Sequence, residues 1–238
     1  MSQTVDMISN DVVILCGGLG KRLRSVTGEA PKVLAILGDD PFLTVILNHI
    51  QNQGFKRVIL CTGYKADDVQ NYYGQSYKNL ELIYSKEDEL LGTGGAIKNA
   101  KKLINSSPFV VLNGDSFCPI KLNKILEFHN KSKAIASITL SKVEDSQDYG
   151  RVRLDENNEI TGFSEKEISA SGFVNAGVYC FDEKIFELMP SEATFSLEKE
   201  CFPNWVGKRF YGYKAEEAFW DIGTPERFSL AKEKFNDR

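Results

Sequence analysis

The segment VVILCGGLGKRLRSVTGEAPKV at residues 12–33 decides how the fold is interpreted, because an apolar run passes directly into glycines and then into basic residues. The β-branched start, residues 12–16, is typical of a buried strand. Glycines after a strand let the backbone turn sharply and bring its amide groups close to a ligand. The lysine and arginines that follow carry charges that match phosphate oxygens. The segment therefore predicts a loop that cradles a polyphosphate.

A tight turn with solvated charges is the alternative interpretation of the same glycines. The loop lacks the Gly-Lys-Ser/Thr ending of a Walker A motif, and Gly18-Leu19-Gly20 is followed by Arg22-Leu23 rather than by the rest of a dinucleotide-binding motif. The position of the loop favours a ligand site, because ligands of alternating α/β sheets bind at the carboxyl ends of the strands.

Strand-like and helix-like segments alternate along the first 140 residues of the chain. Strands are predicted at 12–16, 58–61, 80–84, 109–112 and 135–140, and helices at 42–53, 67–73, 93–104 and 122–130. This alternation predicts a parallel sheet that is covered by helices on both faces.

The pattern changes after residue 140, where short strands become more frequent. Strands are predicted at 150–154 and 160–165 around a turn at 155–158, then at 174–181 and 209–214, with helices at 184–189, 195–202 and 225–234. The sequence has no Ser/Pro-rich linker and no internal repeat. We therefore expect one continuous domain over residues 1–238.

The composition is ordinary for a soluble globular protein, with 42% hydrophobic and 26% charged residues. A net charge of −4 argues against a nucleic-acid binder, which would cluster basic charge. The sequence has neither an apolar run of membrane-spanning length nor a signal peptide, so we expect a cytoplasmic protein without a membrane partner. Five scattered cysteines are expected to be reduced thiols, and His49 and His129 to be surface or core residues rather than metal ligands.

Several further motifs follow the glycine loop in a fixed order along the chain. With Gly17-Gly18-Leu19-Gly20-Lys21-Arg22-Leu23 and Pro31-Lys32, they are Thr62-Gly63-Tyr64, Leu91-Gly92-Thr93-Gly94-Gly95-Ala96, Asn113-Gly114-Asp115, Phe163-Ser164-Glu165-Lys166, Asn175-Ala176-Gly177-Val178-Tyr179 and Asp221-Ile222-Gly223-Thr224-Pro225-Glu226. Together they resemble the signature of the sugar-1-phosphate nucleotidyltransferases, the NDP-sugar pyrophosphorylases. Within that family, Leu23-Arg24-Ser25-Val26 and Phe195-Ser196-Leu197-Glu198-Lys199 are most similar to the D-glycero-α-D-manno-heptose-1-phosphate guanylyltransferases.

Three positions depart from the family pattern. Lys21 stands where the family usually has threonine, Ser25 where proline is common, and Val33 where a second proline usually follows Pro31-Lys32. None of these changes removes a charge that the family's chemistry needs.

The resemblance implies an α/β fold: a three-layer αβα, Rossmann-like nucleotidyltransferase fold with a mostly parallel mixed sheet. It places a nucleotide-binding part at about residues 10–140 and a small β-rich, sugar-binding part at about 141–238. It also implies Mg²⁺-dependent transfer of a nucleoside monophosphate from an NTP, with GTP preferred, to a sugar 1-phosphate. The attacking phosphate is already an anion, so catalysis needs alignment and charge neutralisation rather than a protein nucleophile. A homodimer is expected from the family alone.

The matching positions imply roles for individual residues. As catalytic residues, Asp115 and Asp221 are expected to hold Mg²⁺, Arg22 to bind the β and γ phosphates, and Lys32 to lie by the α-phosphate. Nucleotide-binding residues are expected to be Gly17, Gly18, Leu19, Gly20, Arg22, Glu87, Gly94 and Gly95. Sugar-phosphate-binding residues are expected to be Gly63, Glu165, Lys166, Asn175 and Gly177.

Each assignment has a structural alternative. Asp115 suits a turn, Asp221 suits the approach to a helix, and Gly94-Gly95 suits a plain helix start. Two other functions also fit the motifs. One is a uridylyl-, cytidylyl- or thymidylyltransferase acting on another sugar phosphate such as N-acetylmuramate or glucose 1-phosphate. The other is a non-catalytic nucleotide-sugar-binding regulator, which the intact set of charged residues disfavours.

Overall fold

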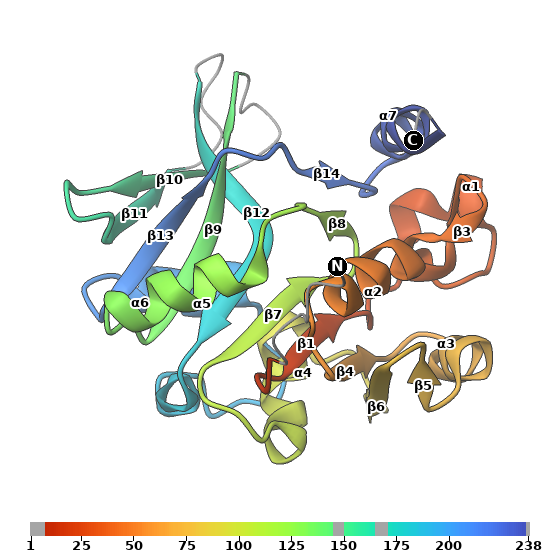
Figure 1. Cartoon of the computed structure of the whole chain (residues 1–238), viewed down its shortest axis with the longest axis horizontal. Coiled ribbons are helices and arrows are strands. Elements are labelled where there is room, and N and C mark those ends of the chain that lie inside the picture. The colour runs from red at the N-terminus through yellow and green to blue at the C-terminus, as the bar shows by residue number, and fades with distance from the viewer. Residues whose placement is uncertain (1–7, 145–149, 165–170, 237–238) are drawn as a thin grey trace, which may run out of the picture.

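The computed structural model describes residues 8–144, 150–164 and 171–236, and one large mixed sheet runs through them (Figure 1). Its strands lie in the order β11-β10-β12-β7-β1-β4-β6-β5, with β9 paired to β12 and β13 paired to β9. They comprise β1 (Val12–Leu15), β4 (Arg57–Thr62), β5 (Ser76–Tyr77), β6 (Leu80–Lys86), β7 (Phe109–Asn113), β9 (Ala136–Val143), β10 (Arg151–Leu154), β11 (Ile160–Ser164), β12 (Gly172–Phe181) and β13 (Phe210–Ala215).

The centre of the sheet is parallel, as the alternating sequence predicts. β1 pairs in parallel with β4 and β7, so that Val13 lies opposite both Ile59 and Val111. All three side chains are fully buried. Continuous apolar strands of this kind form where helices cover both faces of a sheet.

β12 makes the sheet mixed. It lies between β7 and β9 and runs antiparallel to both, whereas β13 runs parallel to β9. The second half of the chain therefore completes the sheet that the first half begins. The predicted mostly parallel mixed sheet is confirmed, although β12 separates β9 from the other predicted parallel strands.

Two apolar clusters, one on each face of the sheet, form the core. Val12 and Ile14 belong to the first cluster and Val13 to the second, because alternate residues of a strand point to opposite faces. The first cluster contains side chains of α2 (Phe42–Asn52), α3 (Ala66–Tyr73), α5 (Leu122–Lys131) and α7 (Pro225–Asn236). The second contains side chains of α4 (Gly92–Asn99) and α6 (Phe202–Trp205).

Three predicted helices are wrong in type or extent. The helix predicted at 93–104 is α4 followed by a 3₁₀ turn at Ala100–Leu103. The helix predicted at 184–189 is a 3₁₀ turn, Glu183–Glu187, and the one at 195–202 is a π-helical turn, Leu197–Cys201, that leads into α6. In segments this short, the spacing of apolar residues does not determine the helix type. It cannot distinguish the i→i+3 hydrogen bonds of a 3₁₀ turn from the i→i+4 bonds of an α-helix or the i→i+5 bonds of a π-helix.

Several short elements lie outside the predicted set. They are α1 (Arg24–Thr27), β2 (Ile36–Leu37), β3 (Asp40–Pro41), β8 (Ser116–Phe117) and β14 (Trp220–Asp221), with 3₁₀ turns at Lys21–Leu23 and Lys32–Leu34. Most of them lie in the connections that follow the central strands, so they shape the edge of the sheet at which ligands bind.

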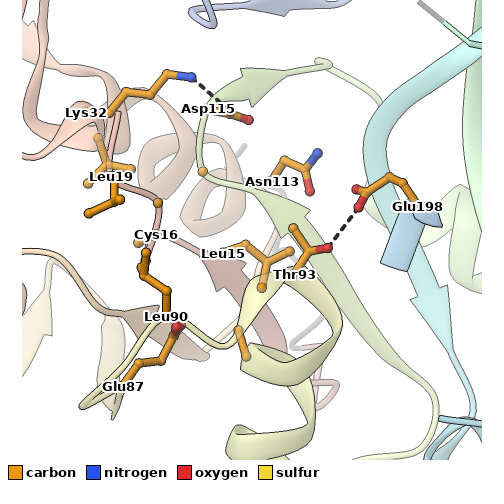
Figure 2. Close-up of a pocket in the computed structure, with 16 residues that line it drawn as sticks. Leu15, Cys16, Leu19, Lys32, Glu87, Leu90, Thr93, Asn113, Asp115 and Glu198 are labelled. Carbon is orange, nitrogen blue, oxygen red and sulfur yellow. Dashed lines mark hydrogen bonds and ion pairs between the residues drawn. The ribbon is translucent and has the colours of Figure 1, made fainter. Parts of the chain in front are cut away.

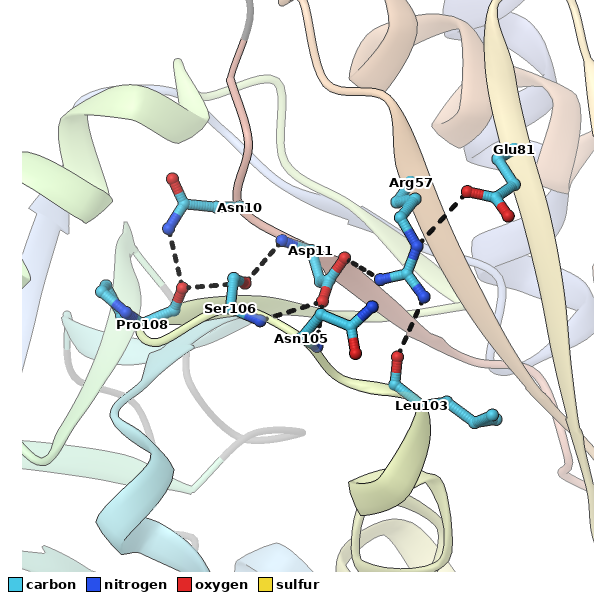
Figure 3. Close-up of polar contacts among 8 residues, drawn as sticks. All are labelled: Asn10, Asp11, Arg57, Glu81, Leu103, Asn105, Ser106 and Pro108. Carbon is cyan, nitrogen blue, oxygen red and sulfur yellow. Dashed lines mark hydrogen bonds and ion pairs between the residues drawn. The ribbon is translucent and has the colours of Figure 1, made fainter.

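A buried carboxylate fixes the opposite, amino-terminal end of β1 (Figure 3). Asp11 is 1% exposed, and its oxygens accept hydrogen bonds from Arg57 Nη1 at 2.5 Å and from the amides of Asn105 at 2.5 Å and Ser106 at 3.1 Å. Arg57 also donates to the carbonyl of Leu103 at 3.1 Å. A charge this deeply buried persists only when it is paired and hydrogen-bonded. The cluster ties β1, β4 and the segment before β7 together.

All five cysteines are buried free thiols, as the sequence predicts. Neither histidine is exposed. His49 Nε2 lies 2.9 Å from the carbonyl oxygen of Ile120, and His129 is on the buried face of α5. No helix in the described ranges is both long and apolar enough to cross a membrane.

His129 predicts a specific pH dependence of stability. Its ring is 2% exposed and Nδ1 lies 2.9 Å from Ser137 Oγ, and burial lowers the pKa of His129 from 6.5 to about 4. Between these values the unfolded chain binds a proton that the folded chain does not. The contribution of His129 to the free energy of unfolding is therefore fully present above pH 6.5. It is lost as the pH falls towards 4, which lowers the stability by about 3 kcal/mol.

Urea unfolding of the wild type and of His129→Gln at about pH 7 and about pH 4.5 measures this contribution. We expect the variant to lose clearly less stability on acidification than the wild type. Equal losses in the two proteins would show that His129 is not the group responsible.

Candidate active site

The predicted phosphate loop follows β1 as a sharp turn. Gly20 has a positive φ of 57°, and Leu23 closes the turn with an amide hydrogen bond to the Gly20 carbonyl at 2.9 Å. A Cβ on Gly20 would lie only 3.1 Å from Lys32 Cβ. Glycine therefore serves two purposes at this position: it adopts the left-handed conformation and it lets the loop approach Lys32.

A cavity of about 440 Å³ opens at this edge of the sheet (Figure 2), which is within the usual range for small-molecule sites. The lining comes from β1 and its loop, the start of α4, the end of β7 and the π-helical turn. Its residues are Leu15, Cys16, Gly17, Gly18, Leu19, Lys32, Val33, Glu87, Leu90, Gly92, Thr93, Ala96, Asn113, Gly114, Asp115 and Glu198. Residues from five of the predicted motifs thus meet at one hollow.

Lys32 and Asp115 form an ion pair at the rim of this cavity. Lys32 Nζ lies 2.8 Å from Asp115 Oδ2, and the lysine side chain is 11% exposed whereas the aspartate is 47% exposed. Lys32 stands in the 3₁₀ turn after Pro31, and Asp115 follows β7. The pair brings together an ammonium and a carboxylate that are 83 residues apart in the sequence.

Asp221 lies next to Asp115 through a two-stranded ladder. In the pairing of β8 with β14, Asp221 is opposite Ser116, and the amide of Ile222 donates to the Asp115 carbonyl at 2.9 Å. Asp221 Oδ1 accepts hydrogen bonds from the Gly223 amide at 2.8 Å and from Arg227 Nη1 at 3.2 Å. Both predicted metal ligands are thereby held at the same edge of the sheet.

The donor set fits Mg²⁺ rather than zinc. Among the described residues, no group of three or more acidic, histidine or cysteine side chains is placed to hold a metal ion. Mg²⁺ needs only one or two protein carboxylates, because phosphate and water oxygens complete its coordination. Asp115 and Asp221 meet that requirement.

Arg22 stands in the 3₁₀ turn after the loop and is exposed. Its Nη2 lies 3.9 Å from the position that a Cβ on Gly223 would take. The Gly223 amide is hydrogen-bonded to Asp221 Oδ1, so Arg22 lies near Asp221. The structure therefore brings Arg22, Lys32, Asp115 and Asp221 to one edge of the sheet, and Lys32 and Asp115 line the cavity.

Glu87 lies at the other end of the cavity from the Lys32–Asp115 pair (Figure 2). Its Oε2 accepts a hydrogen bond from the Leu91 amide at 3.1 Å, and burial raises the pKa of Glu87. A Cβ on Gly17 would lie 2.6 Å from Glu87 Oε1, so this glycine leaves room for the carboxylate. Gly63 packs against the Gly17 carbonyl, which puts Gly63 with the nucleotide loop rather than with the sugar-binding residues predicted on β12.

Asn175 and Gly177 occupy an irregular part of β12, where the register with β9 shifts. Asn175 Nδ2 donates to Tyr179 OH at 2.9 Å, and the Gly177 amide donates to Asn175 Oδ1 at 2.9 Å. Gly177 has a φ of 75°, and a Cβ there would lie 2.2 Å from Ser116 Oγ. Gly177 therefore packs against Ser116 of β8, the residue after Asp115, and Asn175 is hydrogen-bonded to Gly177.

Gly94 and Gly95 pack against another segment instead of lining the cavity. Their amides donate to the Phe195 carbonyl at 3.1 and 3.2 Å. Added Cβ atoms would lie 2.3 Å from the Phe195 ring and 2.3 Å from the Ala193 carbonyl oxygen, respectively. The preceding part of the same motif, Gly92 and Thr93, reaches the cavity. Glu165 and Lys166 lie outside the described residues.

Sequence reasoning missed Thr93 and Glu198 as site residues. Both line the cavity, and Thr93 Oγ1 donates to Glu198 Oε2 at 2.8 Å (Figure 2). Each lies within a motif that was recognised, but nothing in the sequence links two residues that are 105 positions apart.

Cys16 also lines the cavity, but as an inert thiol. Burial, together with the negative charges of Asp115 and Glu87, raises the pKa of Cys16 well above its usual range. Nucleophilic cysteines are thiolates with lowered pKa values. Cys16 therefore lacks the lowered pKa that a nucleophilic cysteine requires.

Comparisons with known proteins agree with this geometry. The family model described as nucleotidyl transferase matches residues 11–238. The chain is 37% identical over 225 residues to a D-glycero-α-D-manno-heptose 1-phosphate guanylyltransferase of Aneurinibacillus thermoaerophilus, covering 94% of this chain and 97% of the relative. A protein of the same name from Campylobacter jejuni is 36% identical and is covered to 96%. Crystal structures of HddC from Yersinia pseudotuberculosis, one of them complexed with GMP-PN, superpose with TM-scores of 0.85 and 0.84 at 37% identity, covering 95% of this chain and 99% of HddC.

Proposed function

The chain belongs to the nucleotidyl transferase family, and from that premise we propose that it transfers GMP from GTP to a sugar 1-phosphate, with D-glycero-α-D-manno-heptose 1-phosphate as the preferred acceptor. The observation that carries the proposal is the convergence of the glycine loop, Lys32 and Asp115 on one cavity. The two named relatives, similar over almost their full length, support the choice of substrates.

The reaction joins two anions. A phosphate oxygen of the sugar 1-phosphate attacks the α-phosphorus of GTP, a new P–O bond forms, and the bond to the β-phosphate breaks to release pyrophosphate. Repulsion between phosphates at contact distance is large in a poorly hydrated cavity. The loop amides and Arg22 would bind the triphosphate, and Lys32 would neutralise the charge that builds at the α-phosphate.

Asp115 and Asp221 would hold Mg²⁺, and the bound ion would supply positive charge to the phosphate oxygens. Lys166 would bind the phosphate of the sugar, with Glu165 and Asn175 at its hydroxyls and Gly177 leaving room for the ring. These roles rest on the family resemblance, and the pairing of Asp221 with the segment after Asp115 supports the first of them.

A panel assay tests the function directly. Pyrophosphate release is measured with each of the four NTPs against heptose, mannose, glucose and N-acetylmuramate phosphates, with and without Mg²⁺. We expect turnover to be fastest with GTP and heptose 1-phosphate and to require Mg²⁺. Turnover with another base or sugar would correct the substrates, and no turnover with any pair would overturn the proposal.

Glu87 accounts for the choice of base. Guanine presents two neighbouring donors, N1–H and the 2-amino group, and an ionised carboxylate is an acceptor for both. We expect Glu87→Gln to lower kcat/KM for GTP roughly 10- to 100-fold, the usual effect of losing a hydrogen bond to a charged group. The wild type should prefer GTP to ITP, which lacks the 2-amino group, and the variant should lose most of that preference.

The pKa of Glu87 adds a pH signature. Because burial raises the pKa of this carboxyl, protonation competes with guanine as the pH falls, and the Kd for GTP should rise on acidification. Calorimetry of GTP binding across pH measures this. An equally strong pH dependence in Glu87→Gln would exclude Glu87 as its source.

A further inference from the structure

Glu198 lines one wall of the cavity. None of the proposed contacts with GTP or the sugar 1-phosphate involves this residue. It belongs to the π-helical turn Leu197–Cys201 and faces the hollow from the side of Thr93 and Asn113 (Figure 2). The side chain is exposed, and it lines the cavity.

The hydrogen bonds around Glu198 orient the hydroxyl protons of Thr93 and Ser196 towards its carboxylate. Thr93 Oγ1 accepts from the Leu197 amide at 2.8 Å, so its only proton goes to Glu198 Oε2 at 2.8 Å. Ser196 Oγ accepts from the amides of Glu198 and Lys199 at 3.1 and 3.3 Å and likewise donates to Oε2 at 2.8 Å.

Within the described part of the chain, the hydrogen bonds to this carboxylate all end at Oε2. Oε1 receives no hydrogen bond from the described residues, so it is available as an acceptor for a ligand or for water.

The surroundings of Glu198 point to a sugar. Glu198 and Asn113 line the same side of the cavity (Figure 2). A Cβ on Gly177 would lie 3.0 Å from Asn113 Nδ2, and the Gly177 amide donates to Asn175 Oδ1 at 2.9 Å, so Glu198 lies on the side of the site that Gly177 and Asn175 approach. Nearby, Asn113 Oδ1 and Ser116 Oγ are buried without a partner among the described residues. Buried polar atoms of this kind are costly unless a bound ligand or water pairs with them.

The segment that carries Glu198 is firmly docked. Lys98 Nζ donates to the carbonyls of Pro190, Ser191 and Glu192 at 2.6, 2.9 and 3.2 Å. Gly94 and Gly95 hold the Phe195 carbonyl, and neither could carry a side chain without displacing the segment. The carboxylate is thus presented from a fixed position, which specific recognition requires.

We propose that Glu198, held by Thr93 and Ser196, binds a hydroxyl group of the acceptor sugar and thereby helps to select the sugar 1-phosphate. The inference rests on the proposed function. A carboxylate repels the phosphates of both substrates, so the substrate group that it binds is a hydroxyl donor rather than a phosphate. The approach of Gly177 and Asn175 to Asn113 on this side of the cavity favours the acceptor sugar over the ribose of the nucleotide.

Glu198→Gln is a sharp test of this role. Thr93 and Ser196 both donate to Oε2, so the amide oxygen should take that place and the amide nitrogen should face the cavity, which turns an acceptor into a donor. We expect the KM for the sugar 1-phosphate to rise roughly 10- to 100-fold, with the KM for GTP changed less than about threefold. In the wild type, one monodeoxy sugar 1-phosphate should be disfavoured by a similar factor, and Glu198→Gln should not discriminate against it further.

Glu200→Gln is the matched control. The substitution removes the same charge from the same turn. Glu200 accepts a hydrogen bond from the Ser196 amide at 2.7 Å, but Glu200 does not line the cavity. We expect it to behave like the wild type.

Two kinetic outcomes would overturn the role of Glu198. The first is that Glu198→Gln raises the KM for GTP instead of the KM for the sugar 1-phosphate, which would assign the carboxylate to the ribose. The second is that Glu198→Gln changes neither KM. If Glu198→Gln does not fold, equal turnover of every monodeoxy sugar by the wild type would overturn it. The proposed function is judged separately, by turnover of the wild type with intact sugars.

Discussion

Lys32→Ala is expected to lower kcat by roughly 10²- to 10³-fold, the usual effect of removing one group that stabilises transition-state charge. Lys32 Nζ is 2.8 Å from Asp115 at the rim of the cavity, and the glycine loop contacts the base of its side chain. The ammonium is proposed to act where charge builds at the α-phosphate. Binding of GTP, which the loop and Glu87 would largely determine, should therefore weaken only several-fold.

Steady-state kinetics and calorimetric GTP binding separate these two effects. Lys86→Ala is a matched control, because Lys86 Nζ also pairs with an aspartate, Asp67, at 2.7 Å, but on the exposed surface. The control should retain wild-type kinetics. Full activity in Lys32→Ala, or a loss of activity explained entirely by weaker GTP binding, would contradict the role assigned to Lys32.

Asp115→Asn and Asp221→Asn are each expected to reduce turnover by a factor of about 10² or more and to raise the Mg²⁺ concentration needed for half-maximal rate. An amide keeps the shape of the side chain but loses the charge that attracts a hard divalent cation. The two residues are proposed to act on the same ion, so the double variant should be little worse than either single variant.

Titration of activity with Mg²⁺ measures the effect, and melting temperatures check the fold, since Asp221 also binds Gly223 and Arg227. Asp67→Asn removes an exposed aspartate outside the cavity and should leave the Mg²⁺ dependence unchanged. An unaltered Mg²⁺ requirement in Asp221→Asn would remove that residue from the proposed metal site.

Local sequence patterns predicted the central strands well. The β-branched run that becomes β1 and the strands that become β4 and β7 are continuous apolar segments, and their burial on both faces follows from that composition. The place of β12 between β7 and β9 could not be predicted in the same way. Which strands are neighbours depends on packing between distant parts of the chain, whereas the pattern of a strand reports only its own burial.

The site shows the same limit. The glycine loop, Lys32 and Asp115 were predicted from motifs, and the structure brings them to one cavity. Gly94 and Gly95 were predicted as nucleotide contacts, but a sequence does not reveal that Phe195 packs against them. Glu198 was missed because a glutamate among other charged residues is usually a solvated surface residue. Only the structure shows that Thr93 binds it at the cavity.

One cavity is proposed to hold GTP and the sugar 1-phosphate together. A crystal structure with Mg²⁺, a non-hydrolysable GTP analogue and the sugar 1-phosphate tests it most directly. We predict guanine at Glu87, the triphosphate on the glycine loop beside Lys32, the metal at Asp115 and Asp221, and the sugar between Asn175 and Glu198. Nucleotide bound elsewhere on the molecule, or phosphates away from Lys32, would contradict the account.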